Sequence, residues 1–220
     1  MYNWVTDKEF LKQSYSECSD IVNHLVQHLK KYGIGANMSV VGSKLRKMVT
    51  QNDKQPIDFD FNLVITEAED INNGRKLKET IRIAFNEVLK ANGWRDCEDS
   101  RSALTTKQRV LKQGNKTAYS IDICIVKVGY GGELHRLIHD KTGNSWMDQY
   151  YWNLAPNSGD LRKKEEFLKP DYWIDVRETY LEKKNYYLRQ NDHNHPSFIC
   201  YIEAINEVYY KVKLQGIFIN

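Results

Sequence analysis

Apolar residues recur at two spacings along the chain, and each spacing predicts one type of element. A return every three or four positions, typical of a helix with one buried face, covers residues 7–31 and 74–91. Thr6-Asp7 is typical of a helix start, and Gly33 and Asn92-Gly93 are typical of helix ends. Continuous or alternating apolar runs predict strands at 38–41, from Ile57 onward, at 117–128 and at 133–139, with weaker candidates at 94–99 and 103–111.

Two segments between these elements, and the last third of the chain, complete the pattern. Residues 44–49 are predicted to form a turn or two of helix, and 51–56 a loop. From Ser145 onward the pattern is helical and aromatic, with helices near 159–168, 171–190 and 197–213. The order of elements predicts an α+β fold. We expect a sheet-bearing core over residues 1–144 and a helical subdomain over residues 145–220 that packs on it.

The strand that begins at Ile57 carries two carboxylates two positions apart. Successive side chains of a strand point to opposite faces, so Asp58 and Asp60 share one side with Asn62. The other side is apolar, with Ile57, Phe59, Phe61 and Leu63. Two adjacent carboxylates repel each other unless a cation lies between them. The pattern therefore indicates a metal site more readily than a strand that has only to fold.

A third carboxylate, Asp122, lies in the middle of the apolar strand predicted at 117–128. Its neighbours on the same face, Ser120 and Cys124, are small. If this strand lies beside the one that carries Asp58 and Asp60, the three acids converge. Carboxylate oxygens on a rigid sheet suit one or two Mg²⁺ ions, which bind carboxylates, water and substrate phosphates. Two such ions activate an attacking hydroxyl and stabilise a leaving pyrophosphate.

Gly42 and Ser43 end the apolar run at 38–41 and are candidates for binding phosphate. A glycine at the end of a strand lets backbone amides approach a phosphate closely. A helix that begins at Ser43 would present free N–H groups, which favour anions. Three cationic residues follow at positions that can offset the charge of a triphosphate: Lys44, Arg46 and Lys47.

Taken together, these motifs resemble the DNA polymerase β-like nucleotidyltransferase superfamily. They are Val41-Gly42-Ser43, then Ile57-Asp58-Phe59-Asp60, then Ile121-Asp122, and the resemblance covers residues 36–128. The long spacing between Ser43 and Asp58, and the third acid within a strand, are closest to the oligoadenylate synthetase and cyclic-dinucleotide synthase branch. The resemblance implies a catalytic core with a mixed, twisted sheet flanked by helices.

The resemblance also implies an activity and roles for the acids. It implies transfer of a nucleoside monophosphate from an NTP to a hydroxyl acceptor, with two Mg²⁺ or Mn²⁺ ions and release of pyrophosphate. Asp58 and Asp60 would bind both metals. Asp122 would bind the catalytic metal and help to deprotonate the acceptor hydroxyl. The acceptor stays open among a nucleotide, RNA, a protein and a small molecule.

Other interpretations of the same residues remain. Alternating acids are also common on the exposed face of an edge strand. The fold is compatible with a non-catalytic or antitoxin-like binding module, or with a pyrophosphokinase of the alarmone-synthetase kind. His135 and His139 have the spacing of a helical metal pair, but without the HExxH glutamate they are interpreted as part of a surface hairpin.

Composition narrows the compartment and the class of partner. A net charge of +3 is too small to indicate a general nucleic-acid binder. Four widely spaced cysteines, with no CxxC pair, are typical of free thiols in a reducing compartment. The N-terminus has no apolar leader core, and no stretch approaches the ~18 apolar residues of a membrane span. We therefore expect a cytoplasmic protein with no membrane partner.

Overall fold

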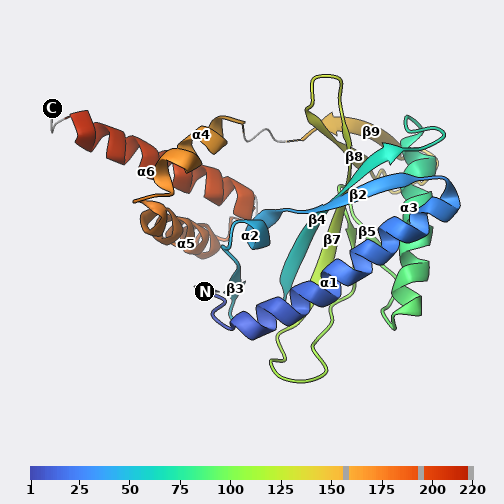
Figure 1. Ribbon diagram of the computed structural model, residues 1–220, viewed down its shortest axis with the longest axis horizontal. Helices are drawn as coiled ribbons and strands as arrows, with labels where there is room; N and C mark the ends of the chain where they lie inside the picture. The colour runs from blue at the N-terminus through green and yellow to red at the C-terminus, as the bar shows by residue number, and fades with distance from the viewer. Residues whose placement is uncertain (156–158, 193–195, 218–220) are drawn as a thin grey trace. The chain divides into compact units, whose positions relative to one another are not determined.

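The computed structural model describes residues 1–155, 159–192 and 196–217, and it divides into two compact units (Figure 1). We call Val5–Lys47 with Lys54–Ala155 the sheet unit. Met1–Trp4, Met48–Asp53 and Pro156–Asn220 form the helical unit. The helical unit therefore takes in two short segments from the first quarter of the chain. The division into a catalytic core and a helical subdomain that packs on it stays a proposal.

The sheet unit is built on a mixed sheet in which β4 and β7 are the central pair. These two strands run parallel, and every other pair in the sheet is antiparallel. The order along the sheet is β2-β4-β7-β6-β5. Outside this order, β8 pairs with β7, and β9 pairs with β8. The strands are β2 Gly35–Val40, β4 Ile57–Glu67, β5 Glu98–Asp99, β6 Leu104–Thr105, β7 Tyr119–Val128, β8 Leu134–Asp140 and β9 Gln149–Leu154.

Two helices, α1 (Lys8–Leu29) and α3 (Gly74–Ala91), pack against this sheet and against each other (Figure 1). The side chain of Asp7 accepts a hydrogen bond from Phe10 N and so caps the start of α1. Tyr15 of α1 stacks on Phe61 of β4, and Phe59 beside it is fully buried. The apolar side of β4 is thus the core of the unit, which leaves its acids on the other side. A short 3₁₀ helix, Lys30–Tyr32, follows α1, and a four-residue helix, α2 (Gly42–Leu45), follows β2.

In the residues that the structure describes, the helical unit contains three helices and a two-stranded sheet. The helices are α4 (Gly159–Leu168), α5 (Trp173–Arg189) and α6 (Ser197–Ile217). β1 (Tyr2–Trp4) pairs antiparallel with β3 (Thr50–Asn52). The buried core includes Leu168, Val176, Tyr180, Cys200, Tyr201, Ala204 and Ile205. The three predicted helices of this half are confirmed.

Most elements lie where the pattern predicts them, with three corrections. Residues 50–52 form β3 where a loop was predicted, because their backbone pairs with the distant β1. The short helix α2 begins at Gly42, two residues early, and ends before Lys47, whose φ of 57° is left-handed. Residues 149–154 form β9, whereas helix was predicted from Ser145 onward. The aromatic residues there alternate between partly buried and exposed, which is the period of a strand.

Within the described ranges, the structure has no helix that is both long enough and apolar enough to cross a membrane.

Candidate active site

The register of β4 and β7 brings the predicted acids together on one face of the sheet. Asp58 lies opposite Ser120, Asp60 opposite Asp122, and Asn62 opposite Cys124. The two strands are therefore neighbours, as convergence of the acids requires. Because paired positions of adjacent strands point to the same side, this face presents a block of polar side chains on an otherwise apolar pair of strands.

The carboxyl group of Asp60 is at the centre of this block. Its pKa is raised to about 7, chiefly by burial and then by the neighbouring Asp122 and Asp58. Arg136 and Arg46 act in the opposite direction. The pKa of Asp122 is also raised, again first by burial, although a hydrogen bond from the Thr105 side chain opposes this. The site therefore holds its negative charge at a cost that Arg136 and Arg46 compensate only in part.

Hydrogen bonding within the acid group is incomplete. Asp58 is exposed, and its Oδ1 accepts a hydrogen bond from the Ser120 hydroxyl. Asp122 Oδ1 is buried and has no hydrogen-bond partner. In the described parts of the chain, no three His, Cys, Asp or Glu side chains are grouped so that they could hold a metal ion. The structure thus places the three acids on neighbouring strands without drawing them together as ligands of one ion.

Gly42 brings the predicted phosphate-binding turn against the acids. Its φ of +67° favours glycine, and a Cβ at this position would lie 2.1 Å from Asp60 Oδ2. The adjacent Val41 N donates a hydrogen bond of 2.9 Å to the backbone oxygen of Asp60. Any side chain at position 42 would displace the Asp60 carboxylate, so the position of this carboxylate depends on a glycine in the turn.

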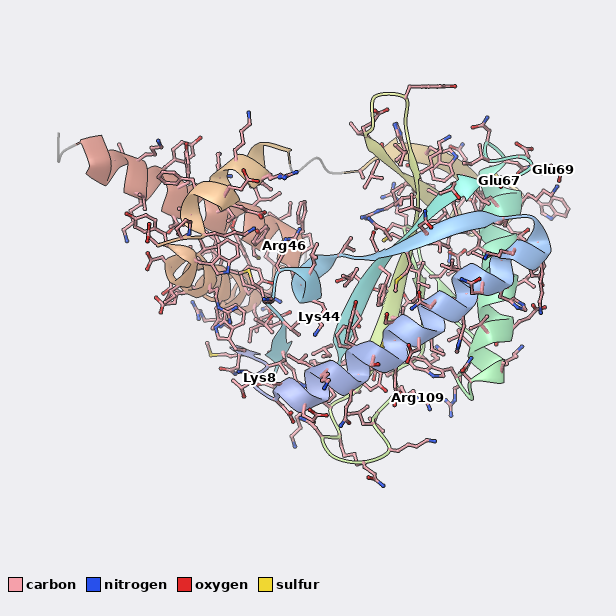
Figure 2. All side chains as sticks on the ribbon, viewed as in Figure 1. Lys8, Lys44, Arg46, Glu67, Glu69 and Arg109 are labelled. Atoms are coloured by element: carbon pink, nitrogen blue, oxygen red, sulfur yellow. The ribbon has the colours of Figure 1, made fainter. Side chains whose placement is uncertain are left out.

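The cationic residues after Gly42 have different surroundings (Figure 2). Lys44 Nζ lies 4.8 Å from the centre of the Tyr15 ring, and burial lowers its pKa. Arg46 is near enough to Asp60 to lower the pKa of that carboxyl. Lys47 is exposed, and Ser43 is half-buried at the start of α2. Of the three predicted cations, Lys44 and Arg46 therefore lie beside the acid-bearing strand or the helix that packs on it.

Arg136 is a residue of this face that the sequence interpretation did not single out. It lies on β8 opposite Val126, which is on the same side of β7 as Asp122. Its Nε is buried without a hydrogen-bond partner, and so is Oδ1 of Asn62, a residue only 9% exposed. The sequence of β8, LHRLIHD, mixes polar and apolar residues, so it carries no local signal that singles out Arg136. Three unpaired buried polar atoms, on Asn62, Asp122 and Arg136, thus share one face.

The predicted histidine hairpin is confirmed as a hairpin, but its placement on the surface is wrong for His139. That side chain is 5% exposed and stacks on the Tyr150 ring, with centroids 4.1 Å apart. Its Nδ1 lies 2.7 Å from Asp99 Oδ2, and its Nε2 lies 2.9 Å from Asp148 Oδ2. The two carboxylates lie too far from His139 in the chain for the local pattern to reveal them. His135, by contrast, stays half-exposed beside Glu133.

Comparisons with known proteins identify the fold. No family model matches the sequence, and no curated protein matches it either. The STING-associated CdnE c-di-GMP synthase from Capnocytophaga granulosa superposes with a TM-score of 0.59 and 15% identity, over 93% of this chain and 61% of that one. CdnC of E. coli MS115-1, solved with ATP, gives 0.56 and 12%, over 91% of this chain and 59% of that one.

A third solved structure agrees with these two. The CdnE cyclic dinucleotide synthase of Elizabethkingia meningoseptica, solved with GTP and Apcpp, gives a TM-score of 0.53 at 14% identity, over 86% of this chain and 68% of that one. The chain spans about three fifths of the length of the first two structures. At these identities the likeness shows the fold, and the expected α+β fold of polymerase β-like nucleotidyltransferases is confirmed.

Proposed function

We propose that the chain is a metal-dependent nucleotidyltransferase that moves a nucleoside monophosphate from an NTP to a hydroxyl acceptor and releases pyrophosphate. The observation that carries the proposal is the half-buried pair Asp60 and Asp122, which lie side by side in register, with Asp60 against the Gly42 turn. A fold shared with solved nucleotide synthases supports the same class of reaction. Arg136 and Arg46 offset only part of the unfavourable charge at Asp60, whose pKa stays raised to about 7.

The chemistry of the donor set fits a hard divalent cation. Asp122 Oδ1, buried without a hydrogen-bond partner, is an acceptor that an Mg²⁺ or Mn²⁺ ion would satisfy. We assign Asp58, Asp60 and Asp122 as the residues that would hold one or two ions, with Asp58 turning away from Ser120 to do so. When bound, such ions offset negative charge on the phosphates and lower the pKa of an attacking hydroxyl.

The residues of the chain itself would bind and orient the substrates. Ser43 and the backbone at Gly42 would bind the triphosphate, and Lys44, Arg46 and Lys47 would offset its charge. In the reaction the acceptor oxygen bonds to the α-phosphorus, and the bond from that phosphorus to the pyrophosphate oxygen breaks. The acceptor loses its proton, which we assign to the Asp122 carboxylate.

We propose that the acceptor is a hydroxyl of a second nucleotide. Two of the proteins with this fold are named as makers of c-di-GMP and of a cyclic dinucleotide, both of which require nucleotide acceptors. Arg136, with its unpaired Nε on the same face, is a suitable donor to a phosphate or base of such an acceptor. The mass of the product formed when NTPs are the only substrates tests this assignment. A product built of linked nucleotides supports a nucleotide acceptor, and no product indicates an RNA, protein or small-molecule acceptor.

Calorimetric titration tests the binding half of the proposal. ATP and GTP, each with Mg²⁺ or Mn²⁺, are titrated into the wild type and into an Asp58→Ala/Asp60→Ala double variant. We expect metal-dependent heat from the wild type and at least tenfold weaker binding by the variant, because the variant lacks two of the three carboxylates. Equal heats from both proteins would overturn the assignment of this site.

A binding module without catalysis is the second candidate, and one observation favours it: in the described chain, the acids are not grouped to hold an ion. Product analysis separates the two candidates. Wild-type protein is incubated with the four NTPs and metal, and pyrophosphate release is followed. Nucleotide binding with no pyrophosphate, together with a protein that co-purifies tightly, would replace the enzyme proposal with the binding module.

A further inference from the structure

The helical unit contains a cavity of its own, about 240 Å³ in volume. Residues of β1, α5 and α6 line it, among them Tyr2, Lys184, Tyr187, Leu188, Ser197 and Cys200. Pockets for drug-sized ligands usually enclose about 300–1,000 Å³, and a water molecule takes about 30 Å³. The cavity is therefore large enough for a small organic molecule but too small for most drug-sized ligands.

Lys184 is the charged residue that distinguishes this cavity. Its side chain is 8% exposed, and its Nζ donates a 2.8 Å hydrogen bond to the Thr50 hydroxyl. The same Nζ lies 3.8 Å from the centre of the Tyr2 ring. Lys184 forms no ion pair with any residue that the structure describes. The ammonium group is thus held by a hydroxyl and an aromatic face, neither of which carries a charge.

The electrostatics of Lys184 follow from this lack of a counter-charge. Burial lowers its pKa to about 8, and the charge on the Cys200 thiol is the one influence that opposes the shift. Asp192 also lines the cavity but forms no ion pair with Lys184. The preceding residue shows the ordinary arrangement, because Lys183 Nζ lies 2.8 Å from Glu207 and 3.9 Å from Glu203. Two consecutive lysines of α5 therefore differ in whether the chain supplies an anion.

A buried ammonium group without a counter-charge is costly to keep protonated. An anion from solution would supply the missing charge, and the cavity gives it space beside Lys184. We propose that this cavity binds a small organic anion, whose carboxylate or phosphate group lies against Lys184 Nζ and whose apolar part lies beside Tyr2 and Leu188. The site involves none of the residues assigned to nucleotide transfer, so it stands or falls independently of that activity.

Thermal unfolding of the full chain with four probe anions tests the proposal. Acetate and benzoate present a carboxylate, and inorganic phosphate and phenyl phosphate present a phosphate, all at matched ionic strength. We expect a concentration-dependent rise in melting temperature with the aromatic member of at least one pair. Comparison of the two aromatic probes shows which anionic group the site prefers. No rise with any probe would overturn the proposal.

Variants of the two lysines connect the effect to the cavity. Lys184→Met keeps the length of the side chain and removes its charge, and Lys183→Met is the matched control from the same helix. We expect at least tenfold weaker anion binding in Lys184→Met and unchanged binding in Lys183→Met. Equal binding by Lys184→Met and the wild type would overturn the proposal, because the anion would then bind elsewhere.

A pH series on the wild type keeps the test independent of how Lys184→Met folds. The titratable groups near Lys184 are Tyr2 from β1, Tyr180 from α5 and Cys200 from α6, and Tyr187 and Asp192 also line the cavity. Burial raises the pKa of the Cys200 thiol. Since the amine loses its charge above pH about 8, we expect benzoate or phenyl phosphate affinity to fall roughly tenfold per pH unit above that value. Affinity that is constant from pH 7 to pH 10 would overturn the proposal.

Discussion

Two groups of acids in the sheet unit differ in how completely they are paired. Around His139, Asp99 lies 2.7 Å from the imidazole and 2.6 Å from Lys78 Nζ, and Asp148 accepts from Thr142 N at 2.8 Å as well as contacting the imidazole. Asp99 Oδ1 has no hydrogen-bond partner, but its distance from Lys78 Nζ is that of an ion pair. On β4 and β7, the acids accept hydrogen bonds from the hydroxyl groups of Ser120 and Thr105 and repel one another.

The difference shows in the direction of the pKa shifts. The pKa of Asp148 is lowered, first by the Thr142 amide and then by His139, whereas burial and two neighbouring acids raise the pKa of Asp60 to about 7. The same side chain is thus stabilised as an anion in one group and destabilised in the other. The first arrangement is expected of residues that hold elements together. The second is expected of residues that bind a cation, which is the role we propose for the acids on β4 and β7.

The largest expected effect is on activity at the unpaired group. Asp122→Asn removes one negative charge and the proposed proton acceptor but keeps the shape of the side chain. We expect nucleotide transfer to fall on the order of 10³-fold, with no loss in the free energy of unfolding. Pyrophosphate release and urea unfolding measure the two quantities. A variant that is less stable by several kcal/mol would show instead that Asp122 has a structural role.

The paired group is expected to respond in the opposite way. His139→Leu removes the ring between Asp99 and Asp148 and leaves Asp99 with Lys78 and, at 4.0 Å, Lys141. We expect the free energy of unfolding to fall by about 2–4 kcal/mol, because a buried charge loses a partner. Nucleotide transfer per folded molecule should change little, since His139 lies outside the proposed site. Urea unfolding that matches the wild type would contradict this account of the cluster.

Arg136 tests whether the unpaired atoms on the sheet face serve substrate binding. Arg136→Met removes the guanidinium and keeps much of the apolar stem. We expect a roughly 10–100-fold loss in kcat/KM, consistent with one charge-assisted hydrogen bond or two, mostly through KM for the acceptor. A fall in stability with unchanged kinetics would instead indicate that Arg136 serves to balance the charge of Asp60.

Asp60→Asn gives the smallest expected effect, and its sign depends on pH. The raised pKa means that folded protein holds the Asp60 proton more tightly than unfolded protein, so ionised Asp60 lowers stability as pH rises from about 4 to about 7. We expect the variant to match the wild type near pH 4 and to exceed its stability by about 1–2 kcal/mol at pH 8. Unfolding at both pH values measures the difference, and a variant less stable at pH 8 would contradict the repulsion.

The acids and the glycine were accessible from sequence because local rules position them. The two-residue period of a strand fixes the common face of Asp58 and Asp60, and Gly42 precedes a turn that favours glycine. Arg136 and His139 were not accessible in this way. Arg136 reaches the site through the pairing of β8 with β7, and His139 is buried by Asp99, forty residues earlier. Non-local pairing also accounts for β3, whose partner is β1.

Thermal unfolding tests most directly whether the acids on β4 and β7 bind a cation together with a nucleotide. The melting temperatures of the wild type and of Asp60→Asn are compared at pH 8, with and without Mg²⁺ and a nonhydrolysable ATP or GTP analogue. We expect the variant to melt at a higher temperature than the wild type without ligand, and Mg²⁺ with nucleotide to raise the melting temperature of the wild type alone. Equal rises in both proteins, or a variant that melts lower without ligand, would contradict this role of the acids.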